Sequence, residues 1–402
     1  MIGPRRRNHV LRAVDSFAAR RISRRRLIRE LLAAGLASPV AAAVLQRVSG
    51  STPIPLANAA PEGRRRRPSP GNRLVVASWG GQFGEEQRKA HFEPFARETG
   101  IEVIVAPQQP EVALIEAQVA SGAVTIDVSN HTSNATNLMA DKGLLDPIRY
   151  DWMDPRIIGG ADPVVRGSHG VGLYTWSFNL SYSGDWFGGS AAPRTWADYW
   201  DVDRFPGPRG FQGLDYDPPL IEVILLANGV PPDKLYPIDI DEAFRLLTDF
   251  RANVEVWTGY GADTTTLLNN GEIAVGQAGA DTIQLAVEDG ADVGFSWQQA
   301  LLYTDNWVIP KGARNIENAH RFIEFCLRPE VQADFTRRVY LGAVVPAAYD
   351  LVPADIQRRA VTAPEHLEKA VPVNVAFWSQ KGGDGKSNLE AVFTKWADWI
   401  LK

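Results

Sequence analysis

Two polar segments of this 402-residue chain contain residue types that can bind a small ligand. In the first, Ser78 and Trp79 follow the apolar residues 74–77 and stand beside Gly80 and Gly81. Flexible glycines do not hold a large ring for packing, so this position favours contact between Trp79 and a ligand. The second segment, residues 129–134, is rich in hydroxyl and amide groups, which supply neutral hydrogen-bond partners.

A third segment, residues 381–387, resembles the variant phosphate loop of chromosome-partitioning ATPases. Glycine N–H groups would cradle phosphate there, and Lys386 and Ser387 would reach phosphate and magnesium. However, Gln380 stands where the ordinary loop has glycine, and few residues follow Ser387, too few for the remaining parts of a nucleotide site. We therefore interpret the segment from Lys381 to Ser387 as a turn before the last helix.

The residue types of enzymes and metal proteins do not form a recognisable motif in this sequence. It has no nucleophile elbow, zinc motif or evident acid pair, and Cys326 is the only cysteine. The apolar pattern around Cys326 is that of a helix with one buried face, which indicates a core thiol. We therefore expect no catalytic residue, no metal and no cofactor.

The segments around these residues alternate between strand-like and helical patterns, as in an α/β fold. Residues 74–105 form a β-loop-α-β unit, whose first loop lies at the carboxyl end of a strand, where such sheets bind ligands. The aromatic strands 171–180 and 303–310 are expected to cross between two lobes. Helices are expected at 112–121, 193–200, 239–250, 263–269, 281–289, 316–327, 330–339 and 389–401, and further strands at 124–128, 254–258, 273–277 and 293–297.

The first 59 residues differ from the rest of the chain. They carry eleven arginines against Asp15 and Glu30, so the formal charge of −5 leaves about −14 for the remainder, which disfavours nucleic-acid binding. Residues 23–29 resemble a twin-arginine export signal, and Ala57-Asn58-Ala59 has the small residues that signal peptidase needs. We expect a signal peptide at 1–59, a flexible linker at 60–72 and a mature chain from Ala60.

The mature chain resembles the spermidine/putrescine-type solute-binding proteins of ABC importers. The similar segments are SWGGQFGEEQRKAHFEPFARETGIEV, NNGEIAVGQAGA, YTDNWVIPKGARNIENAHRFIEFCLRPEVQ and the tryptophan-containing last helix, within residues 73–402. The resemblance implies a two-lobed periplasmic-binding-protein-like α/β fold with a hinged cleft. It implies one lobe of residues 73–175 and 306–370 and a second of 176–305; the lobe of 371–402 stays open.

Family members stack a polyamine on aromatic rings and hold its ammonium groups with carboxylates, an arrangement that cation–π attraction favours. Position by position, the resemblance places the ligand-binding residues at Ser78, Trp79, Phe83, Thr132, Asn134, Asp215, Asp217, Tyr303, Asp305 and Trp378. Each has a structural alternative. The aromatic residues can pack in a core, and Asp305, Thr132 or Asn134 can cap a turn or helix.

One departure from the family pattern affects the ligand. Where the family has tryptophan-asparagine-glycine, this chain has Gly279-Ala280-Asp281, so a stacking ring is absent and a carboxylate is added. Asp281 can line the cleft or serve as the N-cap of the next helix. A wider, less aromatic cleft follows, which leaves the ligand open.

We therefore expect a monomeric, non-enzymatic binding protein in the periplasm. It would capture a small, cationic, polyamine-like solute by hinge closure and deliver it to the membrane permease subunits. The alternatives are an exported enzyme and a nucleotide-binding protein that uses the glycine-rich segment from Lys381 to Ser387.

Overall fold

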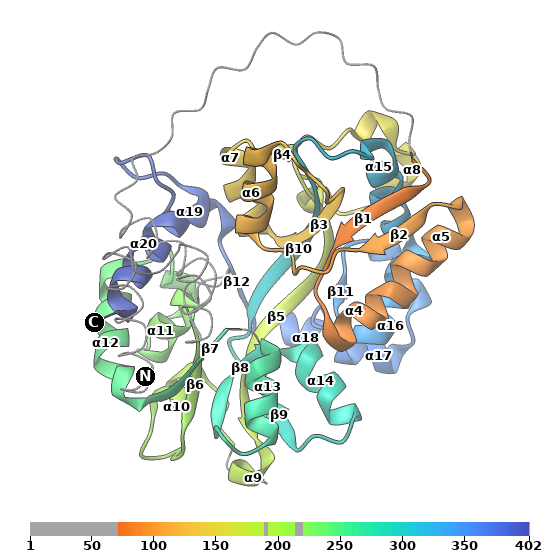
Figure 1. The fold of residues 1–402 in the computed structure, drawn as a ribbon. Helices are drawn as coiled ribbons and strands as arrows, with labels where there is room; N and C mark the ends of the chain where they lie inside the picture. The colour runs from red at the N-terminus through yellow and green to blue at the C-terminus, as the bar shows by residue number, and fades with distance from the viewer. Residues whose placement is uncertain (1–70, 189–191, 214–219, 260, 402) are drawn as a thin grey trace, which may run out of the picture.

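The structure, a computed structural model, describes residues 71–188, 192–213, 220–259 and 261–401 (Figure 1). The expected signal peptide and most of the linker lie outside the described residues, as do Asp215 and Asp217. Within the described residues, no helix is both long and apolar enough to cross a lipid bilayer.

One continuous sheet joins two α/β lobes, which confirms the predicted fold class. Its strands follow the order β2-β1-β3-β10-β5-β8-β6-β7. At its centre, β5 (Val171–Ser183) and β10 (Leu301–Pro310) pair antiparallel and run from one lobe into the other, as Figure 1 shows. These are the two aromatic strands that the sequence predicts as crossings. Their register shifts between Asp305 and Asn306, which places an irregularity at the crossing point.

The first lobe is built on β1 (Arg73–Ala77), which pairs parallel with β2 (Glu102–Val105) and β3 (Val128–Thr132). Two short strands, β4 (Leu145–Asp146) and β11 (Gly342–Ala343), extend the sheet at β10 and β5. Its helices are α4 (Gly81–Gln87), η1 (Arg88–Phe92), α5 (Glu93–Thr99), α6 (Val112–Ser121), α7 (Ser133–Asp141), η2 (Tyr150–Trp152), α8 (Pro155–Gly160), η3 (Pro163–Val165), α15 (Ile316–Cys326), α16 (Pro329–Val339), η6 (Pro346–Leu351), α17 (Ala354–Arg359) and α18 (Pro364–Leu367).

The expected strand at 124–128 is wrong by four residues, because β3 begins at Val128. All five residues of β3 are buried, and its polar groups find partners there: the Ser129 hydroxyl lies 2.8 Å from Nε2 of His131. Before β3, the carboxylate of Asp127 instead accepts backbone N–H groups from β1 and from the loop after β10. The polar residues expected in a loop therefore form the strand itself.

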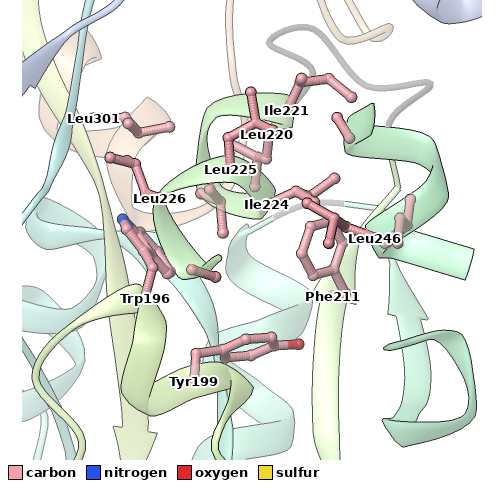
Figure 2. Packing of buried hydrophobic residues seen from close by; sticks show 14 of the residues in the cluster. Trp196, Tyr199, Phe211, Leu220, Ile221, Ile224, Leu225, Leu226, Leu246 and Leu301 are labelled. Atoms are coloured by element: carbon pink, nitrogen blue, oxygen red, sulfur yellow. The ribbon is translucent and has the colours of Figure 1, made fainter. Parts of the chain in front are cut away.

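The second lobe contains the parallel strands β6 (Arg209–Gln212), β7 (Val254–Thr258) and β8 (Val275–Gly279), with β9 (Val293–Phe295) paired to β5. Its helices are α9 (Gly184–Phe187), α10 (Trp196–Trp200), α11 (Ile221–Ala227), η4 (Pro232–Lys234), α12 (Ile240–Phe250), η5 (Arg251–Asn253), α13 (Gly261–Asn269) and α14 (Ala280–Glu288). Figure 2 shows its core, where Trp196 and Tyr199 of α10 pack near Leu225 and Leu226 of α11.

The C-terminal segment contacts both lobes. Its short strand β12 (Val371–Pro372) pairs with β10, and α19 (Val375–Ser379) follows. The Ser379 hydroxyl accepts a hydrogen bond from the Asn137 amide of α7 in the first lobe, at 3.0 Å. The last helix, α20 (Asn388–Ile400), belongs to the core of the second lobe, where Trp396 lies 5.4 Å from the Trp257 ring. This segment therefore forms a third connection between the lobes.

A buried guanidinium organises the start of β6. Arg209 is 1 % exposed, and it donates hydrogen bonds to backbone carbonyls at the end of α10 and in the loop before β6. The acceptors are the carbonyl oxygens of Tyr199, Asp201, Phe205 and Gly207. These bonds fix the loop that leads into the second lobe's sheet.

We predict that Arg209→Met lowers the free energy of unfolding by about 3 kcal/mol, because it leaves buried carbonyls without a donor. Arg204→Met is the matched control, since the Arg204 side chain is 71 % exposed, and it should change stability by less than about 0.5 kcal/mol. Urea denaturation of both variants measures the difference. Equal effects would show that the carbonyl contacts of Arg209 contribute little.

Candidate functional site

A pocket of about 470 Å³ lies between the first loop of the first lobe and two helices of the second lobe. The first lobe contributes the segment from Gly80 to Phe83, directly after β1. The second lobe contributes residues of α13, of α14 and of the turn after α14: Thr265, Thr266, Asn269, Asp281, Thr282, Leu285, Ala286, Asp289, Gly290 and Ala291. The site thus combines chain segments that are distant in sequence.

The glycines after β1 allow a turn that other residues would not accept. Gly81 has a φ of 65°, in the left-handed region that favours glycine. A Cβ atom at Gly84 would lie 2.4 Å from the carbonyl oxygen of Trp79. The backbone therefore folds closely over itself here, and α4 begins immediately beside the pocket.

The carboxylate of Asp305 is the most heavily hydrogen-bonded acidic group of the site. Asp305 is 2 % exposed. Its Oδ2 accepts from the Asn130 amide at 3.0 Å and from the Tyr174 hydroxyl at 2.9 Å, and its Oδ1 accepts from the Trp176 indole at 2.8 Å. The Trp79 side chain also hydrogen-bonds to it. The predicted ring of the first loop is thereby directed at the predicted carboxylate of the crossing strand.

All four hydrogen-bond partners of Asp305 are neutral, so none of them compensates the negative charge of its carboxylate. Burial raises the pKa of its carboxyl above the ordinary value, although the four hydrogen bonds oppose the change. Within the described residues, Asp305 forms no ion pair with a lysine or arginine. A buried carboxylate without a cation is costly, so this end of the site favours a positive charge.

Asp281 adds a second carboxylate at the start of α14. It accepts hydrogen bonds from its own backbone N–H and from the backbone and hydroxyl of Thr282, and it also lines the pocket. Burial, together with the negative charge of Asp305, raises its pKa to about 6. Asp281 therefore lines the pocket from the first turn of α14, and the N-cap interpretation is wrong, because the N-cap of this helix is Gly279.

Of the predicted residues that the structure describes, Phe83 and Asp281 line the pocket, whereas Ser78, Trp79, Thr132, Asn134, Tyr303, Asp305 and Trp378 are absent from its lining. Phe83 lines it and packs against the Tyr174 ring with centroids 5.7 Å apart. Ser78 is buried and donates a hydrogen bond to Gln87. The Thr132 hydroxyl caps α7 by accepting from the backbone N–H of Ala135 at 3.1 Å.

Three further predicted residues are buried and absent from the lining of this pocket. Tyr303 stacks on Trp176 with centroids 4.9 Å apart, so it supports the ring that holds Asp305. Asn134 is 2 % exposed, and neither its amide nitrogen nor its oxygen has a hydrogen-bond partner among the described residues. Trp378 is 1 % exposed and donates its indole N–H to Glu222 at 2.8 Å.

Tyr174 and Trp176, which hold Asp305, were not predicted from the sequence, and neither was the buried Glu222, which is absent from the pocket lining. Tyr174 and Trp176 alternate on one face of β5, and that spacing in an aromatic crossing strand could have indicated a shared direction. Glu222 is a lone carboxyl in the apolar helix α11, where burial raises its pKa to about 7 despite the Tyr236 and Trp378 donors. An acidic residue inside such an apolar run was a signal.

The groups of the site can bind a solute but offer no reactive arrangement. In the described part of the chain, no three histidine, cysteine or acidic residues lie together as metal ligands. The turn from Lys381 to Ser387 closes on itself, and the Ser387 hydroxyl caps α20 rather than facing a phosphate site. A pocket between two lobes that share crossing strands is the arrangement of a two-lobed solute-binding protein.

The chain belongs to the bacterial extracellular solute-binding protein family, whose model matches residues 90–365. It is similar to the gamma-aminobutyric acid-binding protein of Pseudomonas aeruginosa, with 32 % identity over 81 % of this chain and 90 % of that one. It is also similar to the spermidine/putrescine-binding periplasmic protein 1 of Haemophilus influenzae, with 26 % identity over 58 % of this chain and 66 % of that one.

Among solved structures, the PBP AgtB from Agrobacterium tumefaciens R10 in complex with agropinic acid is similar to the chain. The TM-score is 0.73 at 30 % identity, over 82 % of this chain and 99 % of that one. The predicted resemblance to solute-binding proteins of ABC transporters is confirmed, and the chain is the solute-binding component of such a transporter.

We predict that Asp281→Asn raises the stability of the ligand-free protein at pH 7.5 and lowers its affinity for cations about tenfold. The folded-state pKa of Asp281 lies above its ordinary value of 3.8, so the ionised carboxylate lowers the free energy of unfolding above about pH 6. Asparagine keeps the size of the side chain and an oxygen that can accept the same backbone N–H groups in the first turn of α14. We expect a gain of about 1 kcal/mol after allowance for partial exposure, and a smaller gain at pH 5.

Thermal unfolding at the two pH values checks this prediction. Asp289→Asn is the control, since Asp289 lines the same pocket but is exposed at the end of α14. It should change stability by less than about 0.5 kcal/mol. A gain for Asp281→Asn that is the same at pH 5 and pH 7.5 would contradict the proposed charge repulsion.

Proposed function

We propose that this protein captures a small organic cation, an aliphatic amine in particular, by closing its two lobes over it. One observation carries this proposal: the carboxylate of Asp281 lines the pocket, that of Asp305 is buried among neutral donors, and neither has a basic partner within the described residues. The negative charge of Asp305 also raises the pKa of Asp281. A bound ammonium would neutralise both carboxylates and relieve their repulsion. The proposal therefore accounts for two charges that are otherwise unfavourable.

The rest of the pocket suits the carbon chain of such a ligand. Phe83 and Leu285 supply apolar surface from opposite lobes, and Gln82, Thr282 and Asn269 supply neutral hydrogen-bonding groups. No lysine or arginine lines the pocket within the described residues. We infer that the positive end of the ligand lies toward Asp281 and Asp305.

The ligands in the names of the relatives are consistent with an amine as the ligand of this protein. Gamma-aminobutyric acid, spermidine and putrescine all carry a primary amino group, which is an ammonium at neutral pH. The two kinds of ligand differ at the other end, where one has a carboxylate and the others have a second cation. A positive amino group is the feature that this pocket would recognise in either kind.

We further propose the cellular setting that the sequence predicts. The twin-arginine-type leader at 1–59 would direct the chain to the periplasm, and a monomer with residues 73–175 and 306–370 as one lobe and 176–305 as the other would close over its ligand. In this proposal the segment 371–402 stays with the second lobe through α20. The closed form would then dock on the permease subunits.

A set of four-carbon ligands tests the recognition of charge. Putrescine has two ammonium groups, butylamine one, gamma-aminobutyric acid one together with a carboxylate, and butyrate only the carboxylate. We predict that the amines raise the melting temperature of the chain from Ala60 onwards and that butyrate does not. A ligand at a hundred times its dissociation constant adds about 2.7 kcal/mol of stability.

The same four ligands also show which chemical group the natural ligand carries at the end opposite to its amine. Stabilisation by putrescine above butylamine favours a diamine, and stabilisation by gamma-aminobutyric acid above butylamine favours an amino acid. Asp305→Ala should abolish the response to each amine. Binding of butyrate in place of the amines would contradict the cationic assignment and leave the transport role unchanged.

A further inference from the structure

Four side chains join the two lobes beside the pocket. Gln284 and Glu288 come from α14 of the second lobe, and Tyr340 and Arg359 come from the ends of α16 and α17 in the first lobe. We propose that this cluster, here called the interlobe clasp, holds α14 against the first lobe and thereby sets the affinity of the pocket. This inference rests on the proposed function, capture by lobe closure.

The contacts within the clasp are reciprocal. The Arg359 Nη1 lies 2.7 Å from Oε1 of Glu288, and the Tyr340 hydroxyl donates a hydrogen bond to the same carboxylate oxygen. The Arg359 guanidinium also lies 3.7 Å from the centroid of the Tyr340 ring, within cation–π range. Each of the three side chains therefore contacts the other two.

Gln284 closes the cluster through two hydrogen bonds to one residue. Its amide nitrogen donates to the backbone carbonyl of Arg359 at 3.2 Å, and its amide oxygen accepts from Nε of Arg359 at 3.2 Å. An isolated exposed ion pair contributes little, but a side chain that is already ordered by other contacts loses less entropy on pairing. The planar guanidinium is held here at three sites.

The spacing along α14 connects the clasp to the pocket. Asp281, Leu285 and Asp289 recur every four residues and line the pocket, whereas Gln284 and Glu288 form the adjacent stripe that faces the first lobe. Leu285 also packs in the hydrophobic cluster of the first lobe. A movement of α14 away from the first lobe would therefore displace the wall that carries Asp281.

The backbone at Tyr340 agrees with a functional role for the clasp. Tyr340 ends α16 in the left-handed conformation with a φ of 58°, where glycine is favoured. A bulky residue is uncommon in this conformation and persists where the surrounding contacts hold it. Its ring and hydroxyl supply two of the clasp contacts, which glycine could not supply.

The clasp proposal predicts how the affinity for every ligand changes when the clasp is lost. If it stabilises the closed form, its loss lowers the fraction of binding-competent protein, and each ligand loses affinity by the same factor. We expect Arg359→Ala to weaken binding of putrescine and gamma-aminobutyric acid equally, by about tenfold. Arg358→Ala is the matched control, because Arg358 is the neighbouring, exposed arginine of α17, and it should leave affinity unchanged.

Small-angle X-ray scattering tests the clasp without any ligand. We expect the radius of gyration of ligand-free Arg359→Ala to exceed that of the wild-type and Arg358→Ala chains. Tyr340→Phe keeps the ring and removes only the hydroxyl, so it should show an intermediate change, even if the alanine variant folds poorly. An unchanged ligand-free radius in both Arg359→Ala and Tyr340→Phe overturns the proposal.

The two measurements separate this inference from the proposed function. If none of the amines binds, the cationic assignment fails, and the ligand-free scattering still decides whether the clasp exists. If affinities fall unequally between the two ligands, Arg359 acts on the shape of the pocket and the clasp proposal is wrong. Equal losses together with an expanded ligand-free form support it.

Discussion

The carboxylate of Asp305, buried where β5 and β10 change register, is the interaction on which the site depends. It receives hydrogen bonds from Trp79 of the first loop, Asn130 of β3, and Tyr174 and Trp176 of β5. One group thereby fixes the relative positions of three strands and the binding loop. Because all four donors are neutral, they distribute the negative charge without cancelling it. The hydrogen bonds that fix the crossing strands β5 and β10 therefore leave the negative charge of Asp305 uncompensated, and under the proposed function a cationic ligand would compensate it.

The helix α14 extends this charge across the lobe boundary. Its first turn places Asp281 near Asp305, its middle places Leu285 in the core of the first lobe, and its last turn places Glu288 on Tyr340 and Arg359. The helix is otherwise packed on β8, β5 and β9 of the second lobe. The single helix α14 therefore carries both Asp281 and the contacts that hold the lobes together. A movement that separates the lobes would also move the Asp281 carboxylate.

Local patterns in the sequence predicted most elements of the fold closely. The period of apolar residues located α6, α12, α15, α16 and α20 within one or two residues. The side chains of Asp239 and Ser387 also cap α12 and α20, whereas α6 ends at the left-handed Gly122. β3 was displaced because its polar residues are satisfied by partners that are distant in sequence. The pocket residues of α13 and the hydrogen-bond donors around Asp305 were not predicted for the same reason. A local sequence pattern does not show which strand ends and loops lie together in the fold.

Three carboxyl groups with raised pKa values, those of Asp281, Asp305 and Glu222, lower the stability of the fold at neutral pH. Burial raises the pKa of Asp281 to about 6, that of Glu222 to about 7, and that of Asp305 above its ordinary value, so each ionised form opposes folding at neutral pH. Under the proposed function, a cation beside Asp281 would relieve the charge of this pocket residue, and it would act on Asp305 through the interaction between the two carboxylates. Glu222 is instead hydrogen-bonded by Tyr236 and Trp378, and it interacts with the C-terminal segment through the Trp378 indole. In this proposal Asp281 and Asp305 would couple ligand binding to stability, whereas Glu222 affects the packing of the C-terminal segment.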